Sequence, residues 1–290
     1  MAVDEIPPGL AEVLERREAK LERGWWEGSR SYLFATSPEG RLFGRASRDP
    51  ADAAMLEHEV TVREIVGAEG PLRAPTVFDR GPDWLLEAAI EPEPFGGAAH
   101  AEVVAAAAAR LQSLELPELP PRPGRGRARA RLRLIASPLP VADLRRARRI
   151  MAELRLPLVT THGDFHPGNV LISGGAAWVV DWELCGHGPA GSDLLLFGST
   201  IDSAEDRERL LEAAVELAGD RSEALRLAYA VLVRAAAAKL SAAQPFDRDP
   251  EGAKSLLALL PAARQAAGYS AADVPRRSGT RSSTARASSE

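Results

Sequence analysis

The sequence predicts an α+β fold in two lobes, a small N-terminal lobe with an antiparallel sheet and one helix, and a larger, mainly helical C-terminal lobe. Three features of the 290 residues support this prediction. Short β-leaning segments separated by turn residues fill much of the first ninety positions. The Pro- and Gly-rich segment EPEPFGG, 91–97, is typical of a connector. From residue 98 onward, segments with helical propensity and spacing dominate.

The N-terminal lobe is predicted over residues 1–90. Its first segment, PGLAEVLERREAKLER, has helical spacing. The apolar side chains near one face of that helix are Leu10, Val13, Leu14 and Leu21. Aromatic, β-leaning runs then flank the turn sequence SPEG. In chain order, the predicted elements are a helix at 8–23, strands at 31–36 and 41–47, a helix at 49–70, and two short strands within 75–90.

The C-terminal lobe is predicted over residues 91–268 and consists mainly of helices. A short hairpin is expected among them, because the apolar runs VLI and AWVV flank the turn sequence SGG. The Ser-, Arg- and Ala-rich end, 269–290, has few large apolar residues and is predicted to be disordered. The predicted helices lie at 98–116, 140–156, 192–200, 204–219, 221–242 and 251–268.

Composition and charge narrow the class of protein. The net charge of -5 gives no general basic field, so no nucleic-acid partner is expected. The single cysteine, Cys185, excludes an internal disulfide. No uninterrupted apolar run is long enough for a membrane span, and the N-terminus lacks the pattern of a signal peptide. We therefore expect a cytoplasmic protein that has no membrane partner.

One short stretch, THGDFHPGNVLI at 161–172, concentrates polar residues directly before an apolar run. Asp164 lies before Pro167-Gly168, a pair that argues against a continuing helix and favours a loop. Asn169 then begins one arm of the predicted hairpin, and Asp181 ends the other. A hairpin brings these two side chains together at its open end, with Asp164 just before it.

These residue types suit phosphoryl transfer. An Asn carbonyl and an Asp carboxylate are hard oxygen ligands for Mg²⁺, which takes the rest of its coordination shell from water and phosphates. A further ionised Asp can orient an attacking hydroxyl and accept its proton. Charge neutralisation, alignment and a base are what this reaction requires. The sequence therefore predicts a phosphotransferase site built from Asp164, Asn169 and Asp181.

The segments HGDFHPGN, 162–169, and DWE, 181–183, resemble the catalytic loop and the metal-binding segment of the aminoglycoside phosphotransferase family. This is the small-molecule branch of the protein-kinase-like fold, with choline and homoserine kinase relatives. The resemblance extends in order and length over residues 28–268. It implies a bilobal protein-kinase-like fold and an ATP-dependent, Mg²⁺-assisted transfer of the γ-phosphate to a small-molecule hydroxyl. GTP stays open as the donor. Aminoglycoside, choline, homoserine, sugar and other acceptors all stay open.

The resemblance also implies a role for each matching residue. Asp164 corresponds to the catalytic base, and His162 to a structural anchor of the catalytic loop. Asn169 and Asp181 correspond to the Mg²⁺ ligands. Asp193, in GSDLLL, corresponds to an Asp at a helix start that braces the loop. Glu183, the last residue of the DWE segment, is expected at the edge of the metal or substrate site.

The N-terminal lobe matches the family less closely. In such kinases a strand Lys contacts the nucleotide phosphates and pairs with a Glu of the following helix. Glu59 suits that Glu, but Arg45 stands where the Lys is expected, and no lysine lies between Lys20 and Lys239. An Arg keeps the positive charge, although its planar fork is not equivalent to an ammonium group. Backbone groups near Glu87–Ala89, in the hinge strand WLLEAAI, are expected to bind adenine.

Other interpretations stay open beside this one. The replaced Lys and the poor glycine-rich loop, where only Gly28 precedes the strand, suit a kinase-fold binding module or pseudoenzyme. His162 and His166 have the spacing of zinc ligands on a helix, against which the Pro-Gly pair argues. Cys185 and His187 suggest a nucleophile–base pair, but with one residue between them a structural loop cysteine is favoured. The Arg-rich run 122–133 could bind phosphate or nucleic acid; without interleaved aromatic residues, a solvated surface is favoured.

Overall fold

The computed structural model describes residues 6–27, 30–67, 70–116, 139–240 and 250–269. The Arg-rich run and residues 270–290 of the predicted tail lie outside the described residues. The helices are α1 (Pro8–Arg16), α2 (Pro50–Val66), α3 (Ala98–Gln112), α5 (Val141–Glu153), α6 (Ser192–Gly198), α7 (Ala204–Ala218), α8 (Arg221–Leu240) and α9 (Pro250–Ala266), with the 3₁₀ turn η2 (Trp182–Leu184). The strands are β1 (Lys20–Glu27), β2 (Arg30–Ser37), β3 (Gly40–Ser47), β4 (Leu72–Arg73), β5 (Val77–Arg80), β6 (Trp84–Ala88), β7 (Leu158–Thr161), β8 (Val170–Ser173), β9 (Ala176–Val179) and β10 (Gly186–Pro189).

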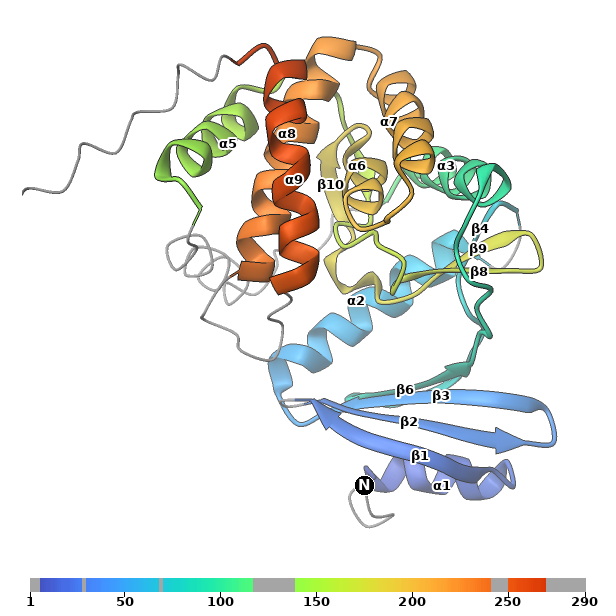
Figure 1. Cartoon of the computed structure of the whole chain (residues 1–290). Helices are drawn as coiled ribbons and strands as arrows, with labels where there is room; N and C mark the ends of the chain where they lie inside the picture. Colours follow the sequence, from blue (N-terminus) through green and yellow to red (C-terminus); the bar gives the residue numbers. More distant parts are fainter. Residues whose placement is uncertain (1–5, 28–29, 68–69, 117–138, 241–249, 270–290) are drawn as a thin grey trace, which may run out of the picture.

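A five-stranded sheet in the order β1-β2-β3-β6-β5 forms the smaller part of the molecule (Figure 1). All its neighbouring strands are antiparallel. One face packs against α1, where Leu10 and Val13 meet Leu33, Leu42 and Leu86 in a buried cluster. Helix α2 lies on the other side of the sheet, between it and the helical part of the chain (Figure 1). One face of the sheet is thus covered by α1, and the other face is directed toward the helical lobe.

The face opposite α1 carries a group of aromatic side chains. Residues directly opposite each other in antiparallel strands share a face, as Trp25 and Tyr32 do here. The ring centroids of Trp25 and Tyr32 lie 5.3 Å apart, and those of Phe34 and Phe43 lie 5.1 Å apart. Arg45 leaves the same face of β3, because it lies directly opposite Tyr32. The sheet therefore presents an aromatic surface with a cation beside it.

The predicted helix 8–23 is too long. The helix ends at Arg16, and residues from Lys20 onward form β1 instead. Glu18 has a left-handed backbone (φ 52°), which turns the chain out of the helix. The following residues pair with β2 from Lys20 to Glu27. The hydrogen bonds and ring stacking of that pairing outweigh a helical propensity that is only a weak preference.

The other predicted helices are present, with shifts at their ends. Helix α2 stops at Val66, just before Gly67, whose φ is 72°, and α3 stops at Gln112. The predicted second arm of the hairpin also ends early, at Val179, because Asp181 is left-handed and opens η2. Sequence analysis missed the short strands β4, β7 and β10, whose partners are far away in the chain. Of the predicted tail, Tyr269 is described, and its ring packs 5.8 Å from that of Tyr229.

The larger lobe is organised around two buried clusters. One joins α3, α6 and α7 to the β8–β9 hairpin and includes Phe165 and Trp182. The other joins α5, α8 and α9. Strand β4 adds to the hairpin in parallel with β9, with Leu72 opposite Ala177. The hairpin that carries the candidate site is therefore fixed both to the helices and to the segment after α2.

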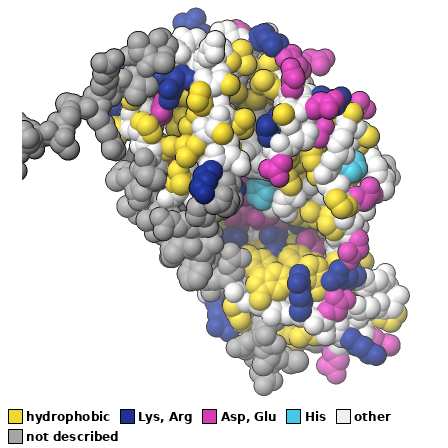
Figure 2. All heavy atoms as spheres, viewed as in Figure 1, with side chains coloured by type: hydrophobic (Ala, Val, Ile, Leu, Met, Phe, Trp, Pro, Cys, Tyr) yellow, Lys and Arg dark blue, Asp and Glu magenta, His cyan; other side chains and the backbone are white. Residues whose placement is uncertain are grey.

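A hollow separates the two lobes in the space-filling view, with hydrophobic and charged side chains gathered along it (Figure 2). In Figure 1, the five-stranded sheet lies on one side of this region and the β8–β9 hairpin on the other. Among the described residues, no helix combines the length and the apolar character that a membrane crossing needs.

Candidate active site

The loop 162–169 connects β7 to β8, and its backbone N–H groups are held by a side chain of α6. Asp193, at the start of α6, accepts hydrogen bonds from the His162 N–H (2.8 Å) and the Gly163 N–H (3.2 Å). Burial raises the pKa of Asp193 to about 6, although the two backbone donors act in the opposite direction. Gly163 has φ 83°, and a Cβ there would lie 2.6 Å from the Leu184 carbonyl oxygen. Only glycine fits this turn.

His162 is fully buried and joins the loop to the hairpin. Its Nε2–H donates to the Val180 carbonyl oxygen (3.0 Å), while its Nδ1 accepts from the Asp164 N–H (3.3 Å). One ring nitrogen is thus a donor and the other an acceptor, which is the pattern of a neutral imidazole. Burial lowers the pKa of His162 to about 4. The His162 ring therefore has a structural role, and it is uncharged near neutral pH.

This buried histidine should make folding sensitive to acid. Its pKa falls from 6.5 to about 4 on folding, so the unfolded chain binds more protons between these values. The stabilisation is fully present above pH 6.5 and is lost as the pH falls toward 4. We expect the free energy of unfolding to lose about 2 kcal/mol between pH 7 and pH 5 from this group. Urea unfolding at both pH values should show a smaller loss in His162→Gln.

The matched control for that measurement is His187→Gln, since His187 is an exposed histidine of β10. Its pH dependence should follow that of the wild type. An equal loss of stability in wild type and His162→Gln would show that His162 does not titrate as its burial indicates.

Asp164 lies at the open end of the hairpin, with 42% of its side chain exposed. Asn169 Nδ2 donates to the Asp164 carbonyl oxygen (3.0 Å) and approaches its carboxylate Oδ2 (3.3 Å). The Nε2 atom of His166 lies 3.6 Å from the same Oδ2. Burial opposes ionisation of the carboxyl group, but His166 and Asn169 outweigh it, so the pKa of Asp164 is lowered. Asp164 is an ionised, accessible hydrogen-bond acceptor.

Asn169 and Asp181 are brought together as the hairpin prediction requires. The Val180 N–H donates to the Asn169 carbonyl oxygen (2.9 Å), which fixes the two chains beside each other one residue before Asp181. The Asn169 amide nitrogen is directed toward Asp164, so its side-chain oxygen remains for another partner. Asp181 adds a carboxylate. An amide oxygen and a carboxylate form a hard-oxygen pair that suits Mg²⁺.

The charge around Asp181 also favours a cation. Burial raises its pKa, and the neighbouring carboxylates Glu59 and Glu183 raise it further, while Arg45 and Arg30 act in the opposite direction. A bound divalent cation would relieve this repulsion. Within the described ranges, no three His, Cys, Asp or Glu side chains gather to hold a metal by themselves. One amide oxygen and one carboxylate leave the rest of a coordination shell to water and phosphates, as Mg²⁺ prefers.

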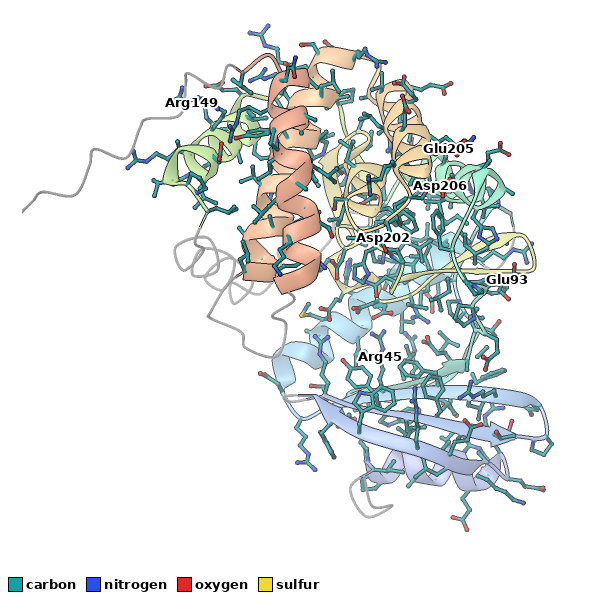
Figure 3. All side chains as sticks on the ribbon, viewed as in Figure 1. Arg45, Glu93, Arg149, Asp202, Glu205 and Asp206 are labelled. Atoms are coloured by element: carbon teal, nitrogen blue, oxygen red, sulfur yellow. The ribbon has the colours of Figure 1, made fainter. Side chains whose placement is uncertain are left out.

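Arg45 and Glu59 form an ion pair deep between β3 and α2. Glu59 is completely buried, and Arg45 is nearly so. Arg45 also reaches across to the helical lobe, where its Nη1 lies 3.4 Å from Asp181 Oδ1. In Figure 3, Arg45 rises from the sheet into the region between the lobes. The structure therefore brings together the predicted substitute for the strand Lys, its helix partner and the predicted metal Asp.

A second arginine, Arg63, extends this pair into a buried network. Its Nε and Nη2 donate to Glu59 Oε1 at 3.0 and 2.7 Å, and its Nη1 pairs with Glu87 in β6. Burial opposes ionisation of Glu59, but the charges of Arg45 and Arg63 outweigh it and lower the pKa. Sequence analysis missed Arg63. Its position four residues after Glu59 on one helix was the available signal.

The hinge residues have partners that sequence analysis did not foresee. The buried Glu87 side chain is committed to Arg63. The Ala89 N–H donates to the Arg41 carbonyl oxygen (2.9 Å), which extends the β3–β6 pairing by one residue. Adenine binding through this segment therefore stays a prediction, and the Ala89 N–H already has an acceptor.

Sequence analysis also missed Arg30, at the start of β2. Its Nη2 lies 2.6 Å from Glu183 Oε2, so it joins the sheet to the segment just after Asp181. A small pocket opens between the lobes at this point. The side chains that line it are Arg30, Arg45, Ala46, Ser47, Leu56 and Glu183. No local sequence pattern pairs residues so far apart in the chain.

The alternative readings of single residues find no support in the geometry. The Nδ1 atom of His166 accepts from the Gly168 N–H (3.0 Å), whereas His162 faces Val180, so the two rings have separate partners. Cys185 is buried, and its carbonyl oxygen accepts from His58 Nε2 (3.3 Å). His187 is exposed on β10.

Comparison with known proteins places this geometry in context. A family profile described as "Phosphotransferase enzyme family" matches residues 23–227, more than half of the chain. Comparison with curated proteins gives no match.

Solved structures of similar fold include three phosphotransferases. A macrolide 2'-phosphotransferase type I is 20% identical (TM-score 0.60), over 90% of this chain and 99% of that chain. A streptomycin–ATP ternary complex of APH(2")-IIa is 11% identical, with a TM-score of 0.59, over 86% of this chain and 93% of that chain. An ethanolamine kinase of Plasmodium vivax is 10% identical, with a TM-score of 0.57, over 90% of this chain and 84% of that chain. Likeness at these identities shows the fold, and it confirms the predicted bilobal, kinase-like α+β fold.

Proposed function

Because the chain belongs to the phosphotransferase enzyme family, we propose that it transfers the γ-phosphate of ATP to a hydroxyl group of a small molecule, assisted by Mg²⁺. The observation that carries the proposal is the meeting of Asp164, Asn169 and Asp181 at the open end of one hairpin. The residues 1–90 would form the nucleotide-binding lobe, and 91–268 the catalytic and acceptor-binding lobe.

Each side chain has a role that its surroundings support. Asp164, ionised and accessible, accepts a hydrogen bond from the acceptor hydroxyl and then its proton. Asn169 and Asp181 would hold Mg²⁺ through their side-chain oxygens. When bound, the ion neutralises phosphate charge. His162 and Asp193 keep the loop in shape and take no part in proton transfer. Arg45 would contact phosphate, because its guanidinium fork suits phosphate oxygens.

The choice of donor and acceptor draws on the similar structures. One of them is a ternary complex with streptomycin and ATP, and another is a spectinomycin phosphotransferase with ADP and spectinomycin. These complexes support ATP as the donor, with GTP as the other candidate, and a small hydroxylated compound as the acceptor. The aromatic sheet face beside Arg45 offers an apolar surface for a purine ring.

Calorimetry with Asp181→Asn tests the metal-dependent phosphate site. We expect wild type to bind ATP with micromolar affinity in the presence of Mg²⁺ and to bind it at least about tenfold more weakly without the ion, because Asp181 supplies the only charged metal ligand of the pair. In Asp181→Asn the dependence on Mg²⁺ should disappear. The matched control is Asp79→Asn, a substitution in β5 on the α1 side of the sheet, which should leave both affinities unchanged.

A kinase-fold binding module is the second candidate. The observation that favours it is that Arg45 is already paired with Glu59 and lies beside Asp181, so its charge is partly satisfied within the protein. The same titrations decide between the two. Lack of binding of ATP and GTP up to millimolar concentration, with and without Mg²⁺, would exclude the phosphotransferase proposal and favour the binding module.

A further inference from the structure

We propose that Arg30 is a second phosphate-binding residue, which exchanges its ion pair with Glu183 for the polyphosphate of the bound nucleotide. The proposal rests on the proposed function and deepens it. It assigns to a side chain of β2 the contact that a glycine-rich loop would make with its backbone. The segment directly before this strand, EGS at 27–29, contains a single glycine, Gly28, so a side-chain contact would compensate for the poor loop.

The register of the sheet places Arg30 beside Arg45. Arg45 lies opposite Tyr32, and the next residues of the same face are Ser47 and Arg30, which lie opposite each other. Two residues along a strand advance the chain by about 7 Å. Arg30 and Arg45 therefore leave the same sheet face as close neighbours, and both line the small pocket between the lobes.

The two arginines face two carboxylates of the other lobe. Arg45 Nη1 lies 3.4 Å from Asp181, and Arg30 Nη2 lies 2.6 Å from Glu183. Two positive groups of the sheet therefore face two negative groups of the segment after β9, and Arg30, Arg45 and Glu183 line the pocket itself. A nucleotide polyphosphate with its Mg²⁺ has the charges in the complementary order, with anionic oxygens toward the arginines and the cation toward the carboxylates.

The present partner of Arg30 is replaceable. About a quarter of the Arg30 side chain and a sixth of the Glu183 side chain are exposed, so the pair lies at the wall of the pocket and is accessible to a ligand there. Phosphate carries more charge than a carboxylate and accepts two parallel hydrogen bonds from a guanidinium. Exchange of Glu183 for phosphate is therefore favourable. Arg45 differs, because its buried partner Glu59 holds it in place.

Titrations with ATP, ADP and adenosine, in Mg²⁺, separate this role from a purely structural one. In Arg30→Gln we expect ATP affinity to fall about tenfold, with a smaller loss for ADP and none for adenosine, because only the phosphates would contact the side chain. Arg30→Lys, which keeps the charge and loses the fork, should lie between wild type and Arg30→Gln. The matched control is Arg16→Gln, which removes an ion pair of the same 2.6 Å length on the α1 side.

Two results would overturn the inference while leaving the proposed function intact. In one, wild type binds ATP and Arg30→Gln binds it within twofold of wild type. In the other, Arg30→Gln weakens ATP and adenosine equally, which would make the Arg30–Glu183 pair a structural contact between the lobes only. If wild type itself binds none of the three compounds, the proposed function fails, and this inference fails with it.

Discussion

Replacing Asp164 with Ala should lower kcat by about 10²- to 10⁴-fold, the range that a positioned general base contributes. The loss would fall on turnover and not on nucleotide binding, because Asp164 contacts Asn169 and His166 and none of the residues of the Arg45 network in the described structure. Steady-state kinetics with an acceptor that wild type phosphorylates would measure turnover, and ATP calorimetry would measure nucleotide affinity separately. We expect ATP affinity to stay within about threefold of wild type.

Asp164→Asn is the informative companion of that variant. It keeps the size of the side chain and its acceptor oxygen for Asn169 Nδ2, but it cannot take a proton. Its activity should be as low as that of Asp164→Ala if proton acceptance matters. Full activity in both variants would exclude Asp164 as the base. Activity in Asp164→Asn alone would reduce its role to positioning.

Glu59→Ala should destabilise the protein by about 3–5 kcal/mol, the cost of breaking a buried ion pair from one side. Glu59 is completely buried between Arg45 and Arg63, so its removal leaves Arg63 paired with Glu87 alone and leaves Arg45 with only its longer contact to Asp181. Urea unfolding followed by circular dichroism would measure the loss. Binding of ATP should weaken as well, because Arg45 would lose the partner that fixes its position.

The control for this effect is Glu64→Ala on the same helix. Glu64 is exposed and lies 3.9 Å from Arg80, so its removal should change stability by no more than about 0.5 kcal/mol. A loss of less than about 1 kcal/mol in Glu59→Ala would show that the network is solvated in solution and is not a rigid support for Arg45.

The parts of the candidate site that lie close together in the sequence could be predicted from it. A turn sequence between two apolar runs predicts a hairpin, and the hairpin alone places Asn169 near Asp181. The contacts that sequence analysis missed join distant segments. Arg63 meets Glu87 across 24 positions, and Arg30 meets Glu183 across the two lobes. Such pairs depend on how α2 and the sheet are packed, which no single segment encodes.

The same distinction explains the error in the first helix. Residues after Arg16 have helical propensity, and nothing in their own pattern predicts a strand. Strand β1 exists because β2 offers a pairing edge and because Trp25 can stack on Tyr32. A preference worth tenths of a kcal/mol per residue cannot compete with that pairing.

The use of Arg45 in place of a lysine has a consequence for chemical labelling. Nucleotide analogues that carry an acylating group react with an uncharged amine near the phosphates. The guanidinium of Arg45 stays protonated, since the pKa of this group is raised by Glu59 and Glu87 despite its burial, and it offers no nucleophile. The only lysines of the chain, at 20, 239 and 254, are absent from the lining of the pocket beside it. Lysine-directed nucleotide probes would therefore leave this protein unmarked, and retention on immobilised nucleotide is the appropriate way to detect its binding.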